Sequence, residues 1–486
     1  MKKDRIVGTF GTQEDIRYFG EFNPKGPDTS LKIYGNDLDA LSDADTIFGI
    51  SHDMQRLTLL QCVNQGLSHS LGAEGMSQSC EIFPHFVLNG WDFFNPSTDR
   101  IDEVTFSVSD IRAIFQNERA FHTILKAQVQ VEKIHENEGE SDEEHVGDGA
   151  ILSYFRGSRI STRFDTPIGT VSVLNVPTIT SRGPFSTAMS ISLTFNAEIT
   201  FSEAINRVLG LRHFLSIIAG RPQGVSELRV HMKTEKVGVE HARKWLKVAW
   251  SMSPMESHYV ERIRLDDFDL PIHAIRHSKE FISIAETWFA TYENSRIARY
   301  RFIECMEHGA SYGVARLVTA ANMFDLLPPD KTPLSKELAP EIASAAEQVK
   351  ALFKGLPDSP ERNSVLTSIG LLGKPSLPKK VNYRAKIVCS RLGHHLPNLE
   401  HVLKIAVKTR NHFVHGSPFA YEAVEDYLTL MTESLEFVFI ASDLIECGWN
   451  ANAWSHKPKT ANHPFARFLA SYRDEIRDFL AASSAL

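Results

Sequence analysis

Three residues near the end of the chain, Arg410, Asn411 and His415, have side chains that suit phosphodiester chemistry. An imidazole exchanges a proton near neutral pH, a guanidinium carries a fixed positive charge, and a carboxamide both donates and accepts hydrogen bonds. Such a set can cleave RNA, because the ribose 2′-hydroxyl can attack its own phosphate without a metal ion. The alternative is structural: His415 would only terminate a helix, and Arg410 would form a surface ion pair.

The segment Asn398–Gly416 is predicted to be the helix that positions these residues. Its first residue is expected to cap the helix and its last one to end it, with apolar residues recurring every three or four positions between them. Residues four apart share a helix face, so Asn411 and His415 are neighbours, and Arg410, about 100° away, reaches across to the same shallow site. The negative end of the helix favours a protonated His415.

The segment that leads to these residues is strongly basic. Between Gly370 and Arg410 the chain carries nine cations and one acid, Glu400, although its net charge is −8. Phosphate neutralisation is the use that we expect, with binding that weakens as salt rises; a basic surface without a partner is the alternative. The predicted RNA-binding residues are Lys379, Lys380, Arg384, Lys386, Arg391, Lys404 and Lys408.

Composition indicates a globular protein of several domains. The 486 residues are 42% hydrophobic and 23% charged. The five cysteines lie far apart and lack metal-ligand spacing, so we expect reduced thiols and no metal site. No apolar run is long enough to span a membrane and no signal peptide precedes the chain, which predicts a cytoplasmic protein. P-loop, dinucleotide-binding and zinc-protease motifs are missing.

Helical periodicity dominates from residue 278 onwards and predicts an antiparallel bundle. The expected helices are Glu280–Arg296, Ser311–Leu327, Pro340–Phe353, Arg362–Leu372, Tyr383–Leu392, Asn398–His415, Val424–Cys447 and Pro464–Leu480.

Before residue 278 the chain is predicted to be mainly strands. Short β-rich runs separated by Gly, Pro, Asn and Asp fill residues 1–134 and return in 150–277, where a helix capped by Ser202 ends at Gly220. Asp110 is expected to cap a short helix, Ile111–Phe115. Residues 135–149 are acidic and glycine-rich and predict an exposed loop, or alternatively a mimic of nucleic-acid charge. The fold class is therefore α+β and multidomain, with a β-rich N-terminal region, possibly bilobed, before an all-α bundle over 278–486.

The spacing Arg410-Asn411-x-x-x-His415, late in a helical region, resembles the Arg-x4–6-His motif of HEPN domains. The domain order resembles ApeA-type proteins, in which a sensor-like N-terminal region precedes a HEPN domain. This resemblance implies a metal-independent endoribonuclease that acts as a homodimer in abortive anti-phage defence. It also implies host RNA such as tRNA as substrate, products with 2′,3′-cyclic phosphate and 5′-hydroxyl ends, and a phage-derived trigger.

Two other functions stay open at this point. A non-catalytic HEPN bundle would bind RNA or a protein without cleavage, and the N-terminal region could be a ligand-binding enzyme, although no acid–base pair stands out there. Within the motif, His412 is expected to be exposed, and Phe413 and Val414 to pack inside the protein. His394, His395 and His401 lack metal-ligand spacing and are expected at the surface or facing RNA.

Overall fold

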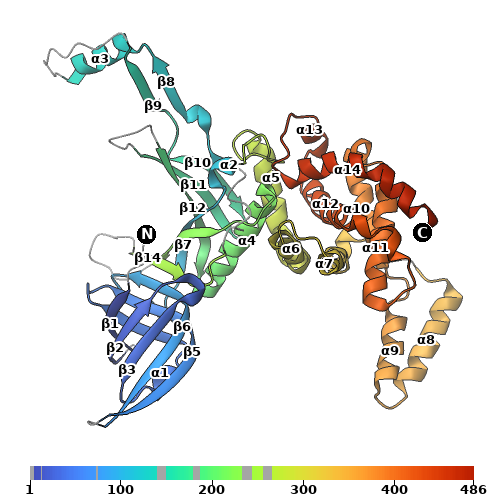
Figure 1. Ribbon diagram of the computed structural model, residues 1–486, viewed down its shortest axis with the longest axis horizontal. Coiled ribbons are helices and arrows are strands. Elements are labelled where there is room, and N and C mark those ends of the chain that lie inside the picture. Colours follow the sequence, from blue (N-terminus) through green and yellow to red (C-terminus); the bar gives the residue numbers. More distant parts are fainter. Residues whose placement is uncertain are drawn as a thin grey trace. The chain divides into compact units, whose positions relative to one another are not determined.

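The computed structural model contains two compact units, each described here by itself (Figure 1). The β unit comprises Met1–Val260 and His273–Ile282, and the helical unit comprises Glu261–Ile272 and Ser283–Leu486. The structure describes residues 5–12, 14–72, 75–138, 149–178, 186–232, 244–254, 265–335 and 337–486. Most of the predicted acidic loop, residues 139–148, lies outside the described residues.

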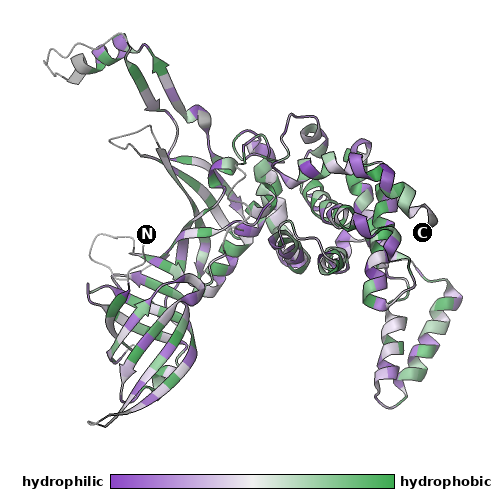
Figure 2. Cartoon of the chain, viewed as in Figure 1, coloured by the Kyte–Doolittle hydropathy of each residue, from purple (hydrophilic) through white to green (hydrophobic). Residues whose placement is uncertain are grey.

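The β unit begins with a closed six-stranded antiparallel barrel. Each strand pairs with its neighbour in the order β6-β3-β2-β1-β4-β5, and β5 pairs again with β6 to close the ring. Hydrophobic and hydrophilic residues alternate along these strands, so one face of each points into the core (Figure 2). The strands are β1 Ile6–Gly11, β2 Ile16–Asn23, β3 Ser30–Gly35, β4 Thr46–Ser51, β5 Arg56–Gly72 and β6 Gly75–Gly90.

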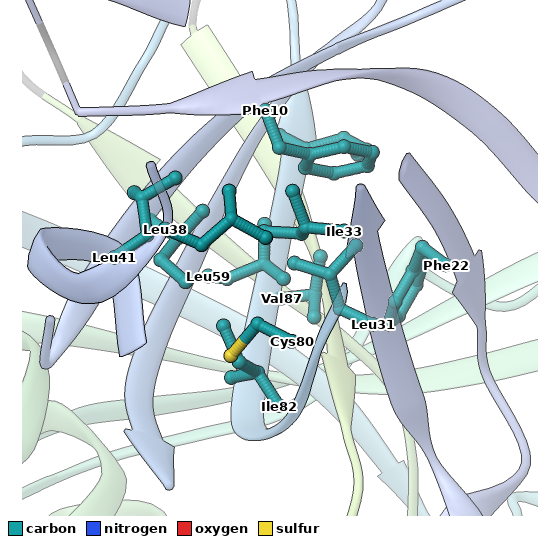
Figure 3. Close-up of a cluster of buried hydrophobic side chains, with 12 residues drawn as sticks. Phe10, Phe22, Leu31, Ile33, Leu38, Leu41, Leu59, Cys80, Ile82 and Val87 are labelled. Carbon is teal, nitrogen blue, oxygen red and sulfur yellow. The ribbon is translucent and has the colours of Figure 1, made fainter. Parts of the chain in front are cut away.

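Phe10 belongs to the barrel core and is completely buried (Figure 3). Its ring lies between two glycines on the strands that flank β1. A methyl group built on Gly20 would lie 2.6 Å from Cδ2 of the ring, and one on Gly49 would lie 2.5 Å from Cδ1. The barrel therefore needs glycine at both positions, because any side chain there would displace the ring.

The sheet continues from β6 into six further strands, in the order β14-β13-β7-β12-β11-β10. One sheet thus joins two regions that the sequence analysis separated at residues 135–149. A small second sheet pairs β8 with β9. The strands are β7 Ile101–Val108, β8 Phe121–Leu125, β9 Ile151–Phe155, β10 Ile160–Thr166, β11 Gly169–Thr178, β12 Ser186–Ile199, β13 Val225–Met232 and β14 Lys244–Trp250.

Helix α4, Phe201–Ala219, contacts β7 and β12 and is mostly buried. Its cap is Thr200, whose hydroxyl accepts the N–H of Glu203, so the prediction that Ser202 caps it is wrong. Gly220 ends the helix with a φ of 69°, as predicted. The other helices of this unit are α1 Asp39–Ser42, α2 Ile111–Phe115 and α3 Gln128–Glu138.

Asp110 precedes α2 as expected but does not cap it through its side chain. Its buried carboxylate instead accepts hydrogen bonds from Arg221 Nε at 2.7 Å and from Gln223 Nε2 at 2.7 Å. A long-range partner replaces the local one because the chain after α4 returns to this point. This buried pair ties the start of α2 to the end of α4.

The helical unit confirms the predicted bundle, with differences at several boundaries. The predicted helix Glu280–Arg296 is two helices, α5 and α6, that break at Thr291, and α13 was not predicted. The helices are α5 Ser278–Ala290, α6 Tyr292–Glu307, α7 Val314–Asp325, α8 Pro340–Lys354, α9 Pro360–Gly370, α10 Leu377–Leu392, α11 Leu399–His415, α12 Leu428–Glu446, α13 Ala451–Ser455 and α14 Pro464–Ala482. Among the described residues, no helix is both long and apolar enough to cross a membrane.

Helix α12 forms the centre of this unit and packs against α6, α7, α10, α11 and α14. Its buried Asp443 accepts a hydrogen bond from Arg299 Nε at 2.8 Å and lies 3.1 Å from Lys331 Nζ. Burial by itself would raise the pKa of Asp443, but the positive charges of Arg299 and Lys331 outweigh it and hold that pKa well below its usual range. The ion pairs fix α6 and the segment after α7 to the central helix.

Candidate active site

Helix α11 carries all three predicted catalytic residues on its last turn and a half. Its apolar face is buried as predicted, and Gly416 ends it in the left-handed conformation with a φ of 66°. Asn398 occupies the N-cap position, but its side chain makes no capping hydrogen bond and its φ is 59°. Asn398 is therefore at the predicted position, but the prediction that its side chain caps the helix is wrong. Leu399, the first residue of the helix, is buried in the bundle.

The guanidinium of Arg410 connects the three residues. Its Nη1 lies 3.0 Å from Oδ1 of Asn411 and 2.9 Å from Nε2 of His415. Arg410 is partly buried and His415 is exposed, so the cluster lies at the surface of the unit. The side chains thus converge on one place, as the helical spacing predicts.

A fourth residue, Asn322 on α7, completes the cluster. Its Oδ1 accepts hydrogen bonds from Arg410 Nη2 at 2.8 Å and from Nε at 3.3 Å. The sequence analysis missed Asn322, which lies 88 positions before Arg410. The available signal was weak: a polar residue of low helix propensity beside an apolar helix face.

The contact with Arg410 determines which ring nitrogen of His415 accepts a hydrogen bond in this arrangement. A guanidinium can only donate hydrogen bonds, so Nε2 of His415 is the acceptor and the ring carries its proton on Nδ1. Four of the five N–H groups of Arg410 are directed at Asn322, Asn411 and His415. A neutral imidazole that can accept a proton therefore lies against a cation that still has one N–H to offer to a ligand.

The other residues of the motif surround this cluster. His412 was expected to be exposed, but it is partly buried, and its Nδ1 lies 2.9 Å from the carbonyl oxygen of Ser417. Phe413 and Val414 were expected to pack inside, but they are 40% and 43% exposed. Phe413 contacts Tyr421 edge to face, at 4.9 Å between ring centroids. Apolar surface is therefore presented beside His415.

The predicted RNA-binding residues differ in exposure. Arg384 is completely buried: its Nε donates to Ser442 Oγ at 2.8 Å, and its Nη1 lies 2.7 Å from Glu446. We therefore withdraw Arg384 as an RNA contact, because a guanidinium inside the bundle cannot reach a phosphate. The periodicity of α10 places it on the face that packs against α12.

Two of the predicted lysines have partners within the helical unit. Lys380 Nζ lies 3.2 Å from the carboxylate of Asp325, one turn of α7 beyond Asn322, which brings its charge near the cluster. Lys408 donates to the carbonyl oxygen of Leu486 at 2.7 Å. The remaining predicted cations are exposed on α10 and α11, and the described structure gives them no ion pair: Lys379, Lys386, Arg391 and Lys404.

The arrangement can support acid–base chemistry on an anionic substrate. One imidazole and two carboxamides each lie within hydrogen-bond distance of the Arg410 guanidinium, and His415 is exposed to a ligand. Among the described residues, no group of three or more His, Cys, Asp and Glu side chains is placed to hold a metal ion.

Comparison with known proteins places both units in one family. Residues 6–288 match the model of ApeA N-terminal domain 1, and residues 318–453 match that of the Apea-like HEPN domain. No curated protein and no solved structure matches the chain. The HEPN match includes Asn322, Arg410, Asn411 and His415 and supports a nuclease-type role in defence. Because the N-terminal match alone spans more than half of the 486 residues, this chain belongs to the ApeA family of proteins with a C-terminal HEPN domain.

Proposed function

We propose that this protein is a metal-independent endoribonuclease that cleaves host RNA during abortive anti-phage defence. The observation that supports this most strongly is the Arg410 guanidinium, which lies 2.9 Å from His415 and is held from behind by Asn322. A cation held in place beside an exposed base suits a reaction in which negative charge accumulates on a phosphate.

In the proposed reaction His415 Nε2 takes the proton of the ribose 2′-hydroxyl. The 2′-oxygen then forms a bond to phosphorus, and the bond to the 5′-oxygen of the next nucleotide breaks as that oxygen takes the proton back from the protonated His415. Proton transfer of this kind contributes roughly 10²–10⁴ in rate. Arg410 stabilises the extra charge of the pentacoordinate phosphate, and Asn411 orients Arg410 through its Oδ1. The products are a 2′,3′-cyclic phosphate and a 5′-hydroxyl.

The base has to be released before it can act, because its lone pair accepts a hydrogen bond from Arg410. A phosphate that binds Nη1 of Arg410 in place of His415 frees Nε2 for the 2′-hydroxyl. The hydrogen bond between Arg410 and His415 also favours a second candidate function, a bundle that binds RNA or a protein without cleaving it. In such a bundle this hydrogen bond would persist, and His415 would not be free to accept a proton. Cleavage assays separate the two.

We propose a homodimer in which a second copy lies against the first at the end of α11. Phe413 and Val414 are exposed beside His415, and apolar surface next to a shallow site suits burial in a protein interface. Two clusters would then line one cleft and grip RNA from both sides. Sedimentation of the full chain tests this: a monomer that retains full activity would refute it.

Transfer RNA is the proposed substrate in the cytoplasm, and a phage-derived component the proposed trigger. A cut in one unpaired anticodon loop inactivates an essential molecule, and unpaired loops are the part of RNA that proteins read most readily. The exposed cations of α10 and α11 would contact its phosphates, so binding should weaken as salt rises.

The deciding experiment incubates purified full-length protein with total bacterial tRNA in the presence of EDTA and identifies the new RNA ends. We expect 2′,3′-cyclic phosphates and 5′-hydroxyls, no inhibition by EDTA, and no cleavage by His415→Ala protein. The matched control is His308→Ala, because His308 is an exposed histidine at the end of α6. RNA that binds but stays intact with wild-type protein would favour the non-catalytic candidate, and cleavage that persists in His415→Ala would refute the assignment.

A cellular test uses growth. Overproduction of wild-type protein should arrest a bacterial culture, and His415→Ala should relieve the arrest while His308→Ala should not. Equal arrest by wild-type and His415→Ala protein would mean that toxicity comes from another part of the chain.

A further inference from the structure

A hollow of about 270 Å³ opens where α10 ends, at the opposite end of α11 from the active-site cluster. This volume is just below the roughly 300–1,000 Å³ of typical ligand pockets, so it suits one small group better than a large molecule. Its walls are mainly polar and come from the last turn of α10, the turn that follows it, and α13. The lining residues are Cys389, Ser390, Arg391, Gly393, His394 and Asn452.

Positive charge surrounds this hollow. Arg391 lines it directly and is exposed; among the described residues it has no ion-pair partner. Arg473 of α14 donates from Nη2 to Nδ1 of His395, the residue after His394 in the wall. Lys459 donates to carbonyl oxygens at the end of α13, at 2.7 Å from that of Ser455. Two helices, α10 and α14, and the loop after α13 thus each contribute a cation to this region.

The pKa of His395 reflects the positive charge of its neighbours. Burial lowers the pKa of His395 to about 4, and the positive charges that add to this effect come from His394, Arg473, Lys459 and His456. The ring centroids of His394 and His395 lie 3.9 Å apart, and those of His394 and His456 lie 5.7 Å apart in a stacked arrangement. The charged neighbours that contribute most to this shift are therefore all positive.

Negative groups nearby are too few to cancel this charge. One carboxylate, Glu400, is close enough to raise the pKa of Cys389, after the larger effect of burial. The C-terminus of α10 adds about half a negative charge, which is a structural reason for a cation at Arg391. Among the groups named here, about one and a half negative charges stand against three permanent positive ones, so positive charge predominates near the hollow.

The imidazoles add hydrogen-bonding capacity suited to an oxyanion. Nδ1 of His456 lies 2.8 Å from the carbonyl oxygen of Asn452, so Nδ1 donates there and Nε2 makes no bond in the described structure. His394 is exposed and likewise unbonded. An anion that enters the hollow would meet a guanidinium and imidazole nitrogens that donate when protonated.

We propose that this hollow, lined by Arg391 and His394 and flanked by His456 and Arg473, is a binding site for a phosphate group, and that the RNA substrate supplies this group from its backbone. Guanidinium and imidazole are the side chains that proteins favour for phosphate, and the size of the hollow suits a single phosphate. The RNA assignment rests on the proposed function; the affinity for phosphate does not.

The position of this phosphate site makes it an anchor for a folded RNA. Helix α11 rises about 24 Å between Leu399, near the hollow, and His415 at the other end. The exposed Lys404 lies between them on the same helix. A phosphate held in the hollow would therefore belong to a part of the RNA several nucleotides away from the scissile bond, which favours a structured substrate over a short single strand.

The test measures RNA binding by full-length His415→Ala protein, which separates binding from cleavage. In this background, Arg391→Ala/Arg473→Ala should weaken binding about tenfold and reduce the slope of log affinity against log salt by about 0.7–0.9, the amount expected for the loss of one phosphate contact. Arg477→Ala, which removes one guanidinium from α14 one turn beyond Arg473 at a 90% exposed side chain, should leave both unchanged. Arg391→Lys/Arg473→Lys should restore the slope, which excludes misfolding as the cause.

A second arm distinguishes backbone phosphate from free phosphate. Inorganic phosphate titrated into the same proteins should bind the parent and not the Arg391→Ala/Arg473→Ala variant, and tRNA should displace it. Phosphate binding that tRNA does not displace would assign the site to a small phosphorylated molecule and overturn the RNA source. Unchanged RNA affinity and salt slope, together with unchanged or undetectable phosphate binding, would overturn the proposal as a whole. Absence of RNA cleavage by wild-type protein would instead refute the proposed function and leave these binding results standing.

Discussion

Replacing Asn322 with alanine removes the oxygen that holds the Arg410 guanidinium from behind. Two contacts disappear, at 2.8 and 3.3 Å, and the first has the length of a charge-assisted hydrogen bond. Hydrogen bonds to charged groups contribute about 1.5–3 kcal/mol. Asn322 is partly exposed and the second contact is long, so we take the lower value, about 1.5 kcal/mol, which corresponds to roughly a tenfold loss of rate.

The loss should appear mainly in kcat. Asn322 does not face the ligand in the proposed reaction; it restricts Arg410 to the position where phosphate charge develops, and an interaction that matters only in the transition state lowers kcat and kcat/KM together. By comparison, Arg410→Ala removes the charge itself and should cost roughly 10²–10³ in rate.

The assay is the initial rate of tRNA cleavage at saturating and at limiting substrate. Thr319→Ala is the matched control, because Thr319 lies on the same helix one turn before Asn322 and its hydroxyl bonds only within that helix, to the carbonyl oxygen of Ala315. Asn322→Ala protein that is folded and as fast as wild type would refute the positioning role. Equal losses in both variants would show that α7 itself had been disturbed.

Three further predictions concern stability. Gly49→Ala places a methyl group 2.5 Å from the Phe10 ring and should lower the unfolding free energy by about 1–3 kcal/mol in urea titrations; an unchanged midpoint would contradict the close contact. Burial, and then neighbouring cations, lower the pKa of His273 from 6.5 to about 4. Between these two pH values the unfolded chain therefore binds more protons than the folded chain. The unfolding free energy should fall by up to about 3 kcal/mol as the pH drops from 6.5 towards 4. In His273→Asn the asparagine can accept hydrogen bonds from the same backbone N–H groups but does not titrate. The melting temperature of this variant should therefore change less between pH 6.5 and pH 4 than that of wild type. An equally steep change in both proteins would assign the loss of stability to other groups. Arg299→Met leaves the Asp443 carboxylate buried with Lys331 as its remaining ion-pair partner. Chemical denaturation should show that the unfolding free energy of the helical unit falls by about 3 kcal/mol. A fall of less than about 1 kcal/mol would mean that Lys331 alone is enough to stabilise the buried carboxylate.

Local patterns were enough to predict the helical region and the clustering of Arg410, Asn411 and His415. Helical spacing on a segment that ends in glycine determines that Asn411 and His415 share a face within reach of Arg410, because these relations depend on backbone geometry alone. The same reasoning predicted the strands of the N-terminal region as a class. It could not predict their order, since closure of β5 onto β6 and continuation of β6 into β14 join residues distant in the chain.

Only the tertiary structure decided which of the predicted cations are exposed and which are buried. Arg384 and Arg391 look alike in the sequence, yet one is sealed against α12 by Ser442 and Glu446 and the other lines an open hollow, because helix packing selects which face of α10 is buried. Packing of α7 against α11 likewise brings Asn322 to Arg410. The physical reason is range: residue types and spacing determine what one turn of helix can do, whereas side chains more than a few turns apart meet only when burial of apolar surface brings their helices together.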